Sequence, residues 1–292
     1  MAYRYSNLMS AVHDAHSPLR EYLDERFPHV RPLQADFRKR SGELLVEGGR
    51  ADPAMVGTAF DLQVRFLLDP SVPPEIAVLG FAGRPDRVEV VTRVMIRARD
   101  AARGGVDQET LGRACWALAL CTDVYRKGLR RGSAVGRLID AGRFTAETLM
   151  SLAPADALRQ LEQLRDVAAT ALLPHVRRPV HLGPTFDASR LCAADADLIA
   201  GGVLIDIKTR LGPRNSETGT RTDRLTRTDI QQLLGYVLFD TSEAYAIRAI
   251  GIYSARYGAL VTWPLDDALR TLAGEPIDLR AARQHVWSLL GG

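Results

Sequence analysis

Hydrophobic residues recur at helical spacing through much of the first 175 residues of this 292-residue chain. Pro28 and the turn-rich segment 69–75 interrupt that spacing. Asp107 can cap a helix that ends at Gly128, and Pro154 suits the first turn of a helix that ends near residue 173. The stretches predicted to be helical are 18–27, 54–69 and 88–175, and the sequence from Pro28 to about residue 50 is polar and irregular.

The pattern changes after Pro179, where short apolar runs bounded by glycine and polar residues predict β-strands. Thr228 and Gln231 match a capping box at the start of a helix. The predicted strands are 180–188, a hairpin within 195–209, 246–255 and 259–263, and the predicted helices are 229–240, 264–273 and 278–290.

This order of elements predicts an α/β fold with a mixed central β-sheet flanked by helices and a helical N-terminal or inserted subdomain. We expect a single domain over residues 1–292, with a helical insertion at 88–175 and a sheet core at 180–263.

Composition narrows the class of protein further. Apolar residues make up 46% of the chain and charged residues 25%, which is typical of a folded globule. No run of 18 apolar residues occurs, so no membrane partner is expected. Three cysteines favour reduced thiols in the cytoplasm, and the six histidines lack the spacing of a zinc site. The net charge of +3 means that any nucleic-acid binding must come from a local basic patch.

The candidate catalytic residues lie in the segment around Gly201-Gly202. A Gly-Gly pair between two extended runs is typical of a two-residue type I′ hairpin turn. That turn fixes the register, so that Asp197 lies opposite Asp206 and Asp195 lies opposite Lys208. One face of the hairpin is then apolar, and the other carries all four charged residues.

Like charges placed directly opposite each other destabilise a sheet. A divalent cation between Asp197 and Asp206 would convert this repulsion into binding, and Mg²⁺ prefers carboxylate oxygens while keeping waters for a phosphate. Lys208 is notable because only three of the 38 basic residues are lysines. It could position or deprotonate an attacking water, or stabilise charge on a phosphate. The alternative is a solvated hairpin face with weak surface ion pairs.

The order of these residues resembles the PD-(D/E)xK nuclease superfamily. Asp197 followed by Asp206-Ile-Lys208 is similar to its D…(D/E)xK motif, and Gln232-Leu-Leu-Gly-Tyr236 is similar to the QxxxY motif of its RecB-like branch. The likeness covers residues 180–260. It implies a restriction-endonuclease-like core and a Mg²⁺- or Mn²⁺-dependent enzyme that hydrolyses phosphodiester bonds of DNA, in DNA repair or phage defence.

The resemblance also implies a metal site. Asp197 and Asp206 would bind the ion, together with the carbonyl oxygen of Ile207. The family has a further acid on a helix before the sheet, and Asp61 is the candidate here. Asp61 lies far upstream, however, and pairing with Arg65 one turn along its helix is an equally good interpretation.

Lys208 would assist the attacking water, while Gln232 and Tyr236, one helical turn apart, would support the site and the DNA backbone. From the residues alone, Tyr236 could equally be a core aromatic and Gln232 a polar residue near the helix start. The alternative function is a catalytically inactive nuclease-fold protein that binds DNA or, through its helical region, a protein partner. The predicted phosphate contacts are arginines of the loop after the catalytic strand, namely Arg210, Arg221, Arg224 and Arg227.

Overall fold

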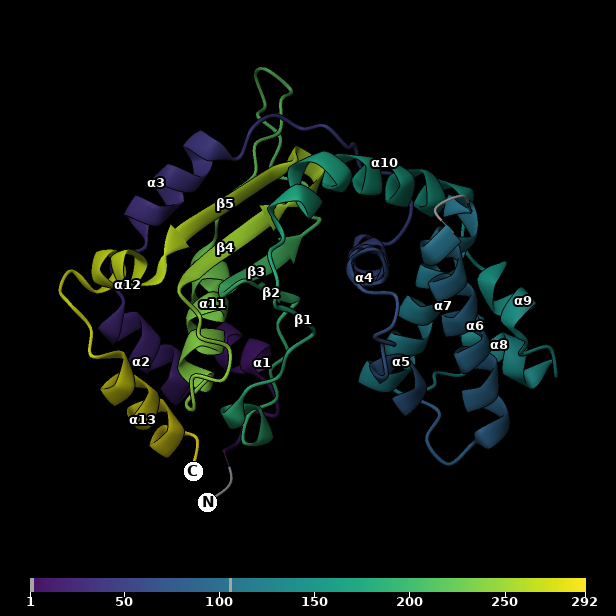
Figure 1. The fold of residues 1–292 in the computed structure, drawn as a ribbon, viewed down its shortest axis with the longest axis horizontal. Coiled ribbons are helices and arrows are strands. Elements are labelled where there is room, and N and C mark those ends of the chain that lie inside the picture. Colours follow the sequence, from purple (N-terminus) through teal and green to yellow (C-terminus); the bar gives the residue numbers. More distant parts are fainter. Residues whose placement is uncertain (1–2, 105–106) are drawn as a thin grey trace. The chain divides into compact units, whose positions relative to one another are not determined.

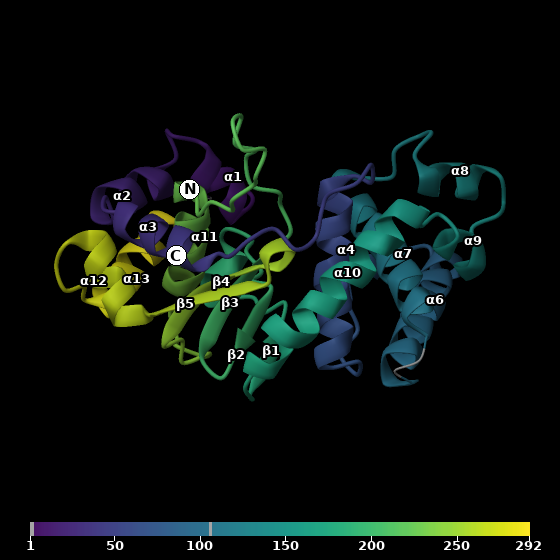
Figure 2. The same ribbon diagram turned by 90° about the horizontal axis from the view of Figure 1, so that it is seen from above.

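The computed structural model describes residues 3–104 and 107–292, which form two compact units (Figures 1 and 2). We call them the sheet unit, which comprises the chain up to Leu44 and Pro174–Gly292, and the helical unit, which comprises Leu45–Leu173. Within the described ranges, no helix combines the length and the apolar character needed to cross a lipid bilayer.

A five-stranded sheet with strand order β1-β2-β3-β4-β5 forms the centre of the sheet unit. β3 and β4 run parallel, and the other neighbouring pairs are antiparallel. The predicted α/β class, with a mixed sheet flanked by helices, is therefore confirmed. The strands are β1 (Val180–Leu182), β2 (Leu198–Ala200), β3 (Val203–Lys208), β4 (Ala249–Ser254) and β5 (Ala259–Pro264).

The β2–β3 hairpin has the predicted turn and register. Gly201 and Gly202 both adopt positive φ, 54° and 78°, which a type I′ turn requires and which glycine adopts without steric cost. The strands pair Ala200 with Val203 and Leu198 with Ile205, and the ladder ends there. The predicted pairs of Asp197 with Asp206 and of Asp195 with Lys208 lie beyond this ladder, and residue 195 forms a bridge to residue 185.

One face of the sheet packs against a layer of helices through a shared apolar core. Ile199, Leu204 and Ile252 enter this core from the strands, and Leu233 and Val237 enter it from helix α11 (Arg227–Phe239). The other helices of the layer are α1 (Leu8–His13), α2 (Pro18–Arg26), α3 (Arg31–Arg40), α12 (Leu265–Ala273) and α13 (Leu279–Leu289).

Helix α11 connects the parallel strands β3 and β4 and begins two residues earlier than predicted. Its N-cap is Thr226, whose hydroxyl accepts a hydrogen bond from the Asp229 N–H at 3.1 Å. The predicted box of Thr228 and Gln231 is wrong because Thr226 and Asp229 form the reciprocal cap instead. Gly235 lets α11 approach α1 closely, since an added Cβ would lie 2.6 Å from a methyl group of Leu8.

Two further predictions in the sheet unit need correction. The predicted strand 180–188 stops at Leu182, and the 3₁₀ helix η2 (Asp187–Arg190) follows. Helix α3 forms in a segment predicted to be irregular, and helix α1 lies where no element was predicted. For α3 the reason is that Leu33 and Phe37, four residues apart, bury one face in the core.

The helical unit is larger than the predicted insertion at 88–175. It begins at Leu45 because α4 packs against α7 and α10. The predicted cap is confirmed, since the Asp107 carboxylate accepts a hydrogen bond from the Thr110 N–H at 2.9 Å. The helices are α4 (Pro53–Leu68), α5 (Ile76–Leu79), α6 (Pro85–Gly104), α7 (Gln108–Lys127), α8 (Ala134–Asp140), α9 (Ala146–Met150) and α10 (Ala155–Ala171), and the 3₁₀ helix η1 (Leu173–His175) follows them.

Candidate functional site

Asp206 is a buried carboxylate on the central strand β3, with only 2% of the residue exposed. Lys208, two residues along the same strand, lies on the same face and forms an ion pair with it at 2.7 Å. This burial excludes the alternative of a solvated hairpin face. An ionised carboxylate in such a place is costly unless charges or hydrogen bonds compensate it.

Asp197 lies one residue before β2, just beyond the last paired residues of the hairpin. One of its carboxylate oxygens accepts a hydrogen bond from the backbone N–H of Ile207 at 2.7 Å. Burial is the main cause that raises the pKa of Asp206 and of Tyr236, and the charge of Asp197 adds to the rise in both. Asp195 is exposed and forms no contact with the Lys208 ammonium.

Lys208, Gln232 and Tyr236 form a continuous chain of hydrogen bonds. The Lys208 ammonium donates to the Gln232 side-chain oxygen at 2.9 Å, and the Gln232 amide donates to the Tyr236 hydroxyl at 2.7 Å. Gln232 and Tyr236 share one face of α11, as their i, i+4 spacing predicts. Tyr236 is also buried in the apolar core, so it serves as a core aromatic and as part of the polar chain.

Burial and neighbouring charges shift the pKa values of both charged groups of this ion pair. Burial raises the pKa of the Asp206 carboxyl to about 6, with Lys208 opposing that rise and Asp197 adding to it. Burial lowers the pKa of the Lys208 ammonium, but the attraction of Asp206 and Asp229 outweighs burial and leaves this pKa above its usual value. Lys208 therefore stays protonated at neutral pH.

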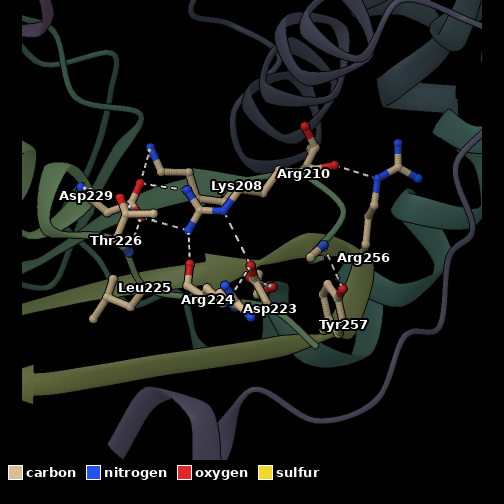
Figure 3. Close-up of polar contacts among 12 residues, drawn as sticks. Lys208, Arg210, Asp223, Arg224, Leu225, Thr226, Asp229, Arg256 and Tyr257 are labelled. Carbon is tan, nitrogen blue, oxygen red and sulfur yellow. Dashed lines mark hydrogen bonds and ion pairs between the residues drawn. The ribbon is translucent and has the colours of Figure 1, made fainter. Parts of the chain in front are cut away.

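Asp229 and Arg210 adjoin the cluster, and sequence reasoning missed this role for both (Figure 3). The Asp229 carboxylate lies 3.7 Å from the Lys208 ammonium and accepts two hydrogen bonds from the Arg210 guanidinium, at 2.7 and 2.8 Å. Burial raises the pKa of Asp229, but Arg210 outweighs burial and holds it below its usual value. The T-x-x-D spacing from Thr226 to Asp229 was the available sequence signal.

Three predicted phosphate contacts have partners within the sheet unit. Arg210 binds Asp229 and Asp223, Arg221 donates to the carbonyl oxygen of Gly212 at 2.8 Å, and Arg227 pairs with Asp24 at 2.7 Å. The fourth, Arg224, has an exposed side chain. Arg224 is therefore better placed than the others to meet a ligand from solvent.

The predicted metal ligands lie in different units. Asp197, Asp206 and Ile207 belong to the sheet unit, whereas Asp61 belongs to α4 of the helical unit and pairs with Arg65 at 2.9 Å. Among residues 3–104 and 107–292, no three His, Cys, Asp or Glu side chains are gathered closely enough to hold a metal ion by themselves. Any metal at this site would need ligands besides protein side chains.

Comparison of the chain with protein-family models, curated proteins and solved structures found no match.

Proposed function

We propose that this protein is a divalent-metal-dependent nuclease that hydrolyses phosphodiester bonds of DNA. The observation that carries the proposal is the buried carboxylate of Asp206, which lies near Asp197 and pairs with Lys208 on the same strand face. The strand order and the β3–α11–β4 crossover are compatible with the restriction-endonuclease-like core that the sequence resemblance implies.

The donor set suits Mg²⁺ or Mn²⁺. Two carboxylates and the Ile207 carbonyl supply hard oxygen ligands, and Mg²⁺ commonly binds through one or two carboxylates while retaining waters. Burial raises the pKa of Asp206 because it disfavours the ionised carboxylate, Asp197 adds to that rise, and a bound cation would favour the ionised form. We leave Asp61 outside this ligand set because its carboxylate pairs with Arg65.

When bound, the ion would polarise a phosphate oxygen and make a water more acidic. In hydrolysis, the water oxygen bonds to phosphorus, one P–O ester bond breaks, and the leaving oxygen takes up a proton. Lys208 stays protonated, so it acts as a hydrogen-bond donor to charge that develops on the phosphate rather than as a base. Gln232, held by the Tyr236 hydroxyl, orients the Lys208 ammonium for that task.

A cleavage assay tests this function directly. Purified protein is incubated with linear duplex, closed circular and single-stranded DNA in Mg²⁺, Mn²⁺ or EDTA. An Asp206→Asn variant purified in the same way controls for contaminating nucleases. We expect cleavage by the parent that requires metal and that the variant lacks. Equal cleavage by both proteins, or cleavage of none of the substrates, would overturn the proposal.

The second candidate is a catalytically inactive protein that binds DNA without cutting it. One observation favours it, namely that the described residues contain no ready-made group of three metal-binding side chains. A gel-shift measurement on the same three DNAs separates the two functions. Retention of DNA by a parent protein that leaves all substrates intact would favour this candidate.

A further inference from the structure

The loop between β3 and α11 forms an ordered tongue, residues 211–224, visible as the green loop rising above the sheet in Figure 1. A β-bridge between Arg214 and Arg221 closes it. At its tip, the Asn215 side chain accepts hydrogen bonds from the N–H groups of Glu217 and Thr218 at 2.8 and 3.1 Å. The tongue therefore has internal structure, and its position depends on how its base is held.

Two hydrogen bonds join the base of the tongue, formed by Gly212 and Asp223, to the end of β4 and to the 3₁₀ helix η3 (Ala255–Tyr257) that follows it. The Tyr257 hydroxyl accepts a hydrogen bond from the Gly212 N–H at 2.9 Å, and the Ser254 hydroxyl donates to the Asp223 carboxylate. Gly212 is needed because an added Cβ would lie 1.8 Å from the carbonyl oxygen of Thr222, on the opposite side of the tongue. Asp223 is only 1% exposed.

Arg210 joins this base to α11 with all three nitrogens of its guanidinium group (Figure 3). Its Nε lies 3.4 Å from the Asp223 carboxylate, and its Nη1 and Nη2 form the paired hydrogen bonds with Asp229. Nη2 also donates to the carbonyl oxygen of Arg224 at 2.5 Å. A guanidinium already bound at every nitrogen is poorly suited to hold a phosphate as well.

Asp229 contacts both Arg210 and the Lys208 ammonium, so it links the base of the tongue to the candidate site. One of its oxygens accepts hydrogen bonds from the Thr226 N–H and hydroxyl at 2.7 and 2.6 Å and from Arg210. The other oxygen faces both Arg210 and the Lys208 ammonium. The Lys208 ammonium thus lies beside Asp206, Gln232 and Asp229, and Asp229 connects it through Arg210 to the base of the tongue.

We propose that Arg210 and Asp229 are positioning residues for Lys208, and that they fix the tongue and the Lys208 ammonium as one assembly. The sequence-based role of Arg210 as a phosphate contact is replaced by this one. Because both residues act through Lys208, their role in cleavage rests on the proposed nuclease function. Their effect on the Lys208 environment does not depend on cleavage and can be measured in the free protein.

The first experiment compares steady-state kinetics of Arg210→Ala with those of Arg224→Ala. Arg224 is a matched control because it lies on the same tongue and its substitution keeps the carbonyl oxygen that Arg210 contacts. Arg210→Ala should lower kcat by about 100-fold with little change in KM, since misplacing a catalytic group by 1 Å has roughly that cost. Arg224→Ala should instead raise KM. A raised KM with unchanged kcat in Arg210→Ala would restore the phosphate-contact role and overturn the proposal.

The second experiment is an NMR measurement of lysine side chains, which is simple to interpret because the chain has only three lysines. Side-chain ¹⁵N-lysine labelling gives NMR signals from only Lys39, Lys127 and Lys208. The Lys208 ammonium signal should shift or broaden in Arg210→Ala and in the milder Asp229→Asn, which retains the shape of the carboxylate. The signal of the exposed Lys39 should stay in place, and far-UV circular dichroism checks that both variants remain folded.

The NMR result distinguishes failure of this inference from failure of the proposed function. If the parent protein cuts no DNA but the Lys208 signal responds to both substitutions, the nuclease function fails and the coupling of Arg210 and Asp229 to Lys208 stands. An unchanged Lys208 signal in both folded variants would overturn the positioning role, whatever the cleavage assay shows.

Discussion

The sheet unit contains two neighbouring charge clusters in which the pKa of a buried carboxyl is shifted in opposite directions. At Asp206, burial outweighs the attraction of Lys208 and raises the pKa to about 6, and the charge of Asp197 adds to the rise. Around Arg210, the guanidinium binds Asp229 and Asp223, and the pKa of Asp229 is lowered. Burial alone would raise the pKa of both Asp206 and Asp229, so the difference comes from the partners.

The cluster around Asp206 has the character of a ligand-binding site, whereas the cluster around Arg210 has a structural role. A buried carboxylate that lacks sufficient positive charge weakens the fold, and it persists where a ligand or a reaction uses it. A buried carboxylate with a bidentate arginine is satisfied by the protein alone and fixes the elements that it joins. The position of Lys208 between the two clusters makes it the residue whose change should have the largest effect.

Lys208→Ala should reduce the cleavage rate by about 100- to 1,000-fold, the usual cost of removing one preorganised donor to developing charge. Metal and DNA affinity should change little, because Lys208 is not a metal ligand. The measurement is the single-turnover rate at saturating protein. Lys127→Ala is the control, since Lys127 pairs with Asp123 in the helical unit. Cleavage by Lys208→Ala at the parental rate would leave Lys208 as only a partner of Asp206.

The titration of Asp206 should make the metal-free protein less stable as pH rises. The folded-state pKa of about 6 lies above the unfolded value near 4, so the folded protein holds a proton that the unfolded chain has lost. The free energy of unfolding of the parent, relative to Asp206→Asn, should fall by roughly 3 kcal/mol between about pH 4 and pH 6. Denaturant unfolding of both proteins in EDTA measures this difference, and a constant difference across the window would contradict it.

Divalent metal should restore the stability that ionisation of the buried Asp206 removes. A ligand that binds only the folded state adds about 2.7 kcal/mol at about 100 times its Kd. Mg²⁺ or Mn²⁺ should therefore raise the melting temperature of the parent and do much less for Asp206→Asn. Asp229→Asn serves as the contrast, because it removes a carboxylate from the satisfied cluster and keeps the proposed ligands. An identical response of parent and Asp206→Asn would show that the acid cluster is not a metal site.

The smallest expected effect concerns the exposed arginine of the tongue. Arg224→Ala should weaken DNA binding without sequence preference. It should also reduce the slope of log affinity against log salt by about 0.9, the value for one duplex phosphate that the protein no longer neutralises. Arg227→Ala should change that slope less, because Arg227 pairs with Asp24. Fluorescence anisotropy at several salt concentrations measures both slopes. Equal slopes for the parent and Arg224→Ala would place the DNA path elsewhere.

The amino-acid sequence by itself determined the hairpin and the strand that carries Asp206 and Lys208. A Gly-Gly pair specifies the turn, and the two-residue period of a strand then places both side chains on one face. The i, i+4 spacing of Gln232 and Tyr236 likewise placed them on one helix face. These signals are local, since each acts over a few residues and needs no knowledge of the rest of the fold.

Only the tertiary structure decided which charges are satisfied and which are not. Arg210 and Asp229 are 19 residues apart in the chain, and nothing in the residues between them shows that the tongue folds back to join them. The start of α11 was predicted at Thr228, and the structure places the cap at Thr226, where the Asp229 carboxylate is held by Thr226 and Arg210. A side chain's partners are set by packing over the whole unit, whereas sequence patterns report only which face it occupies.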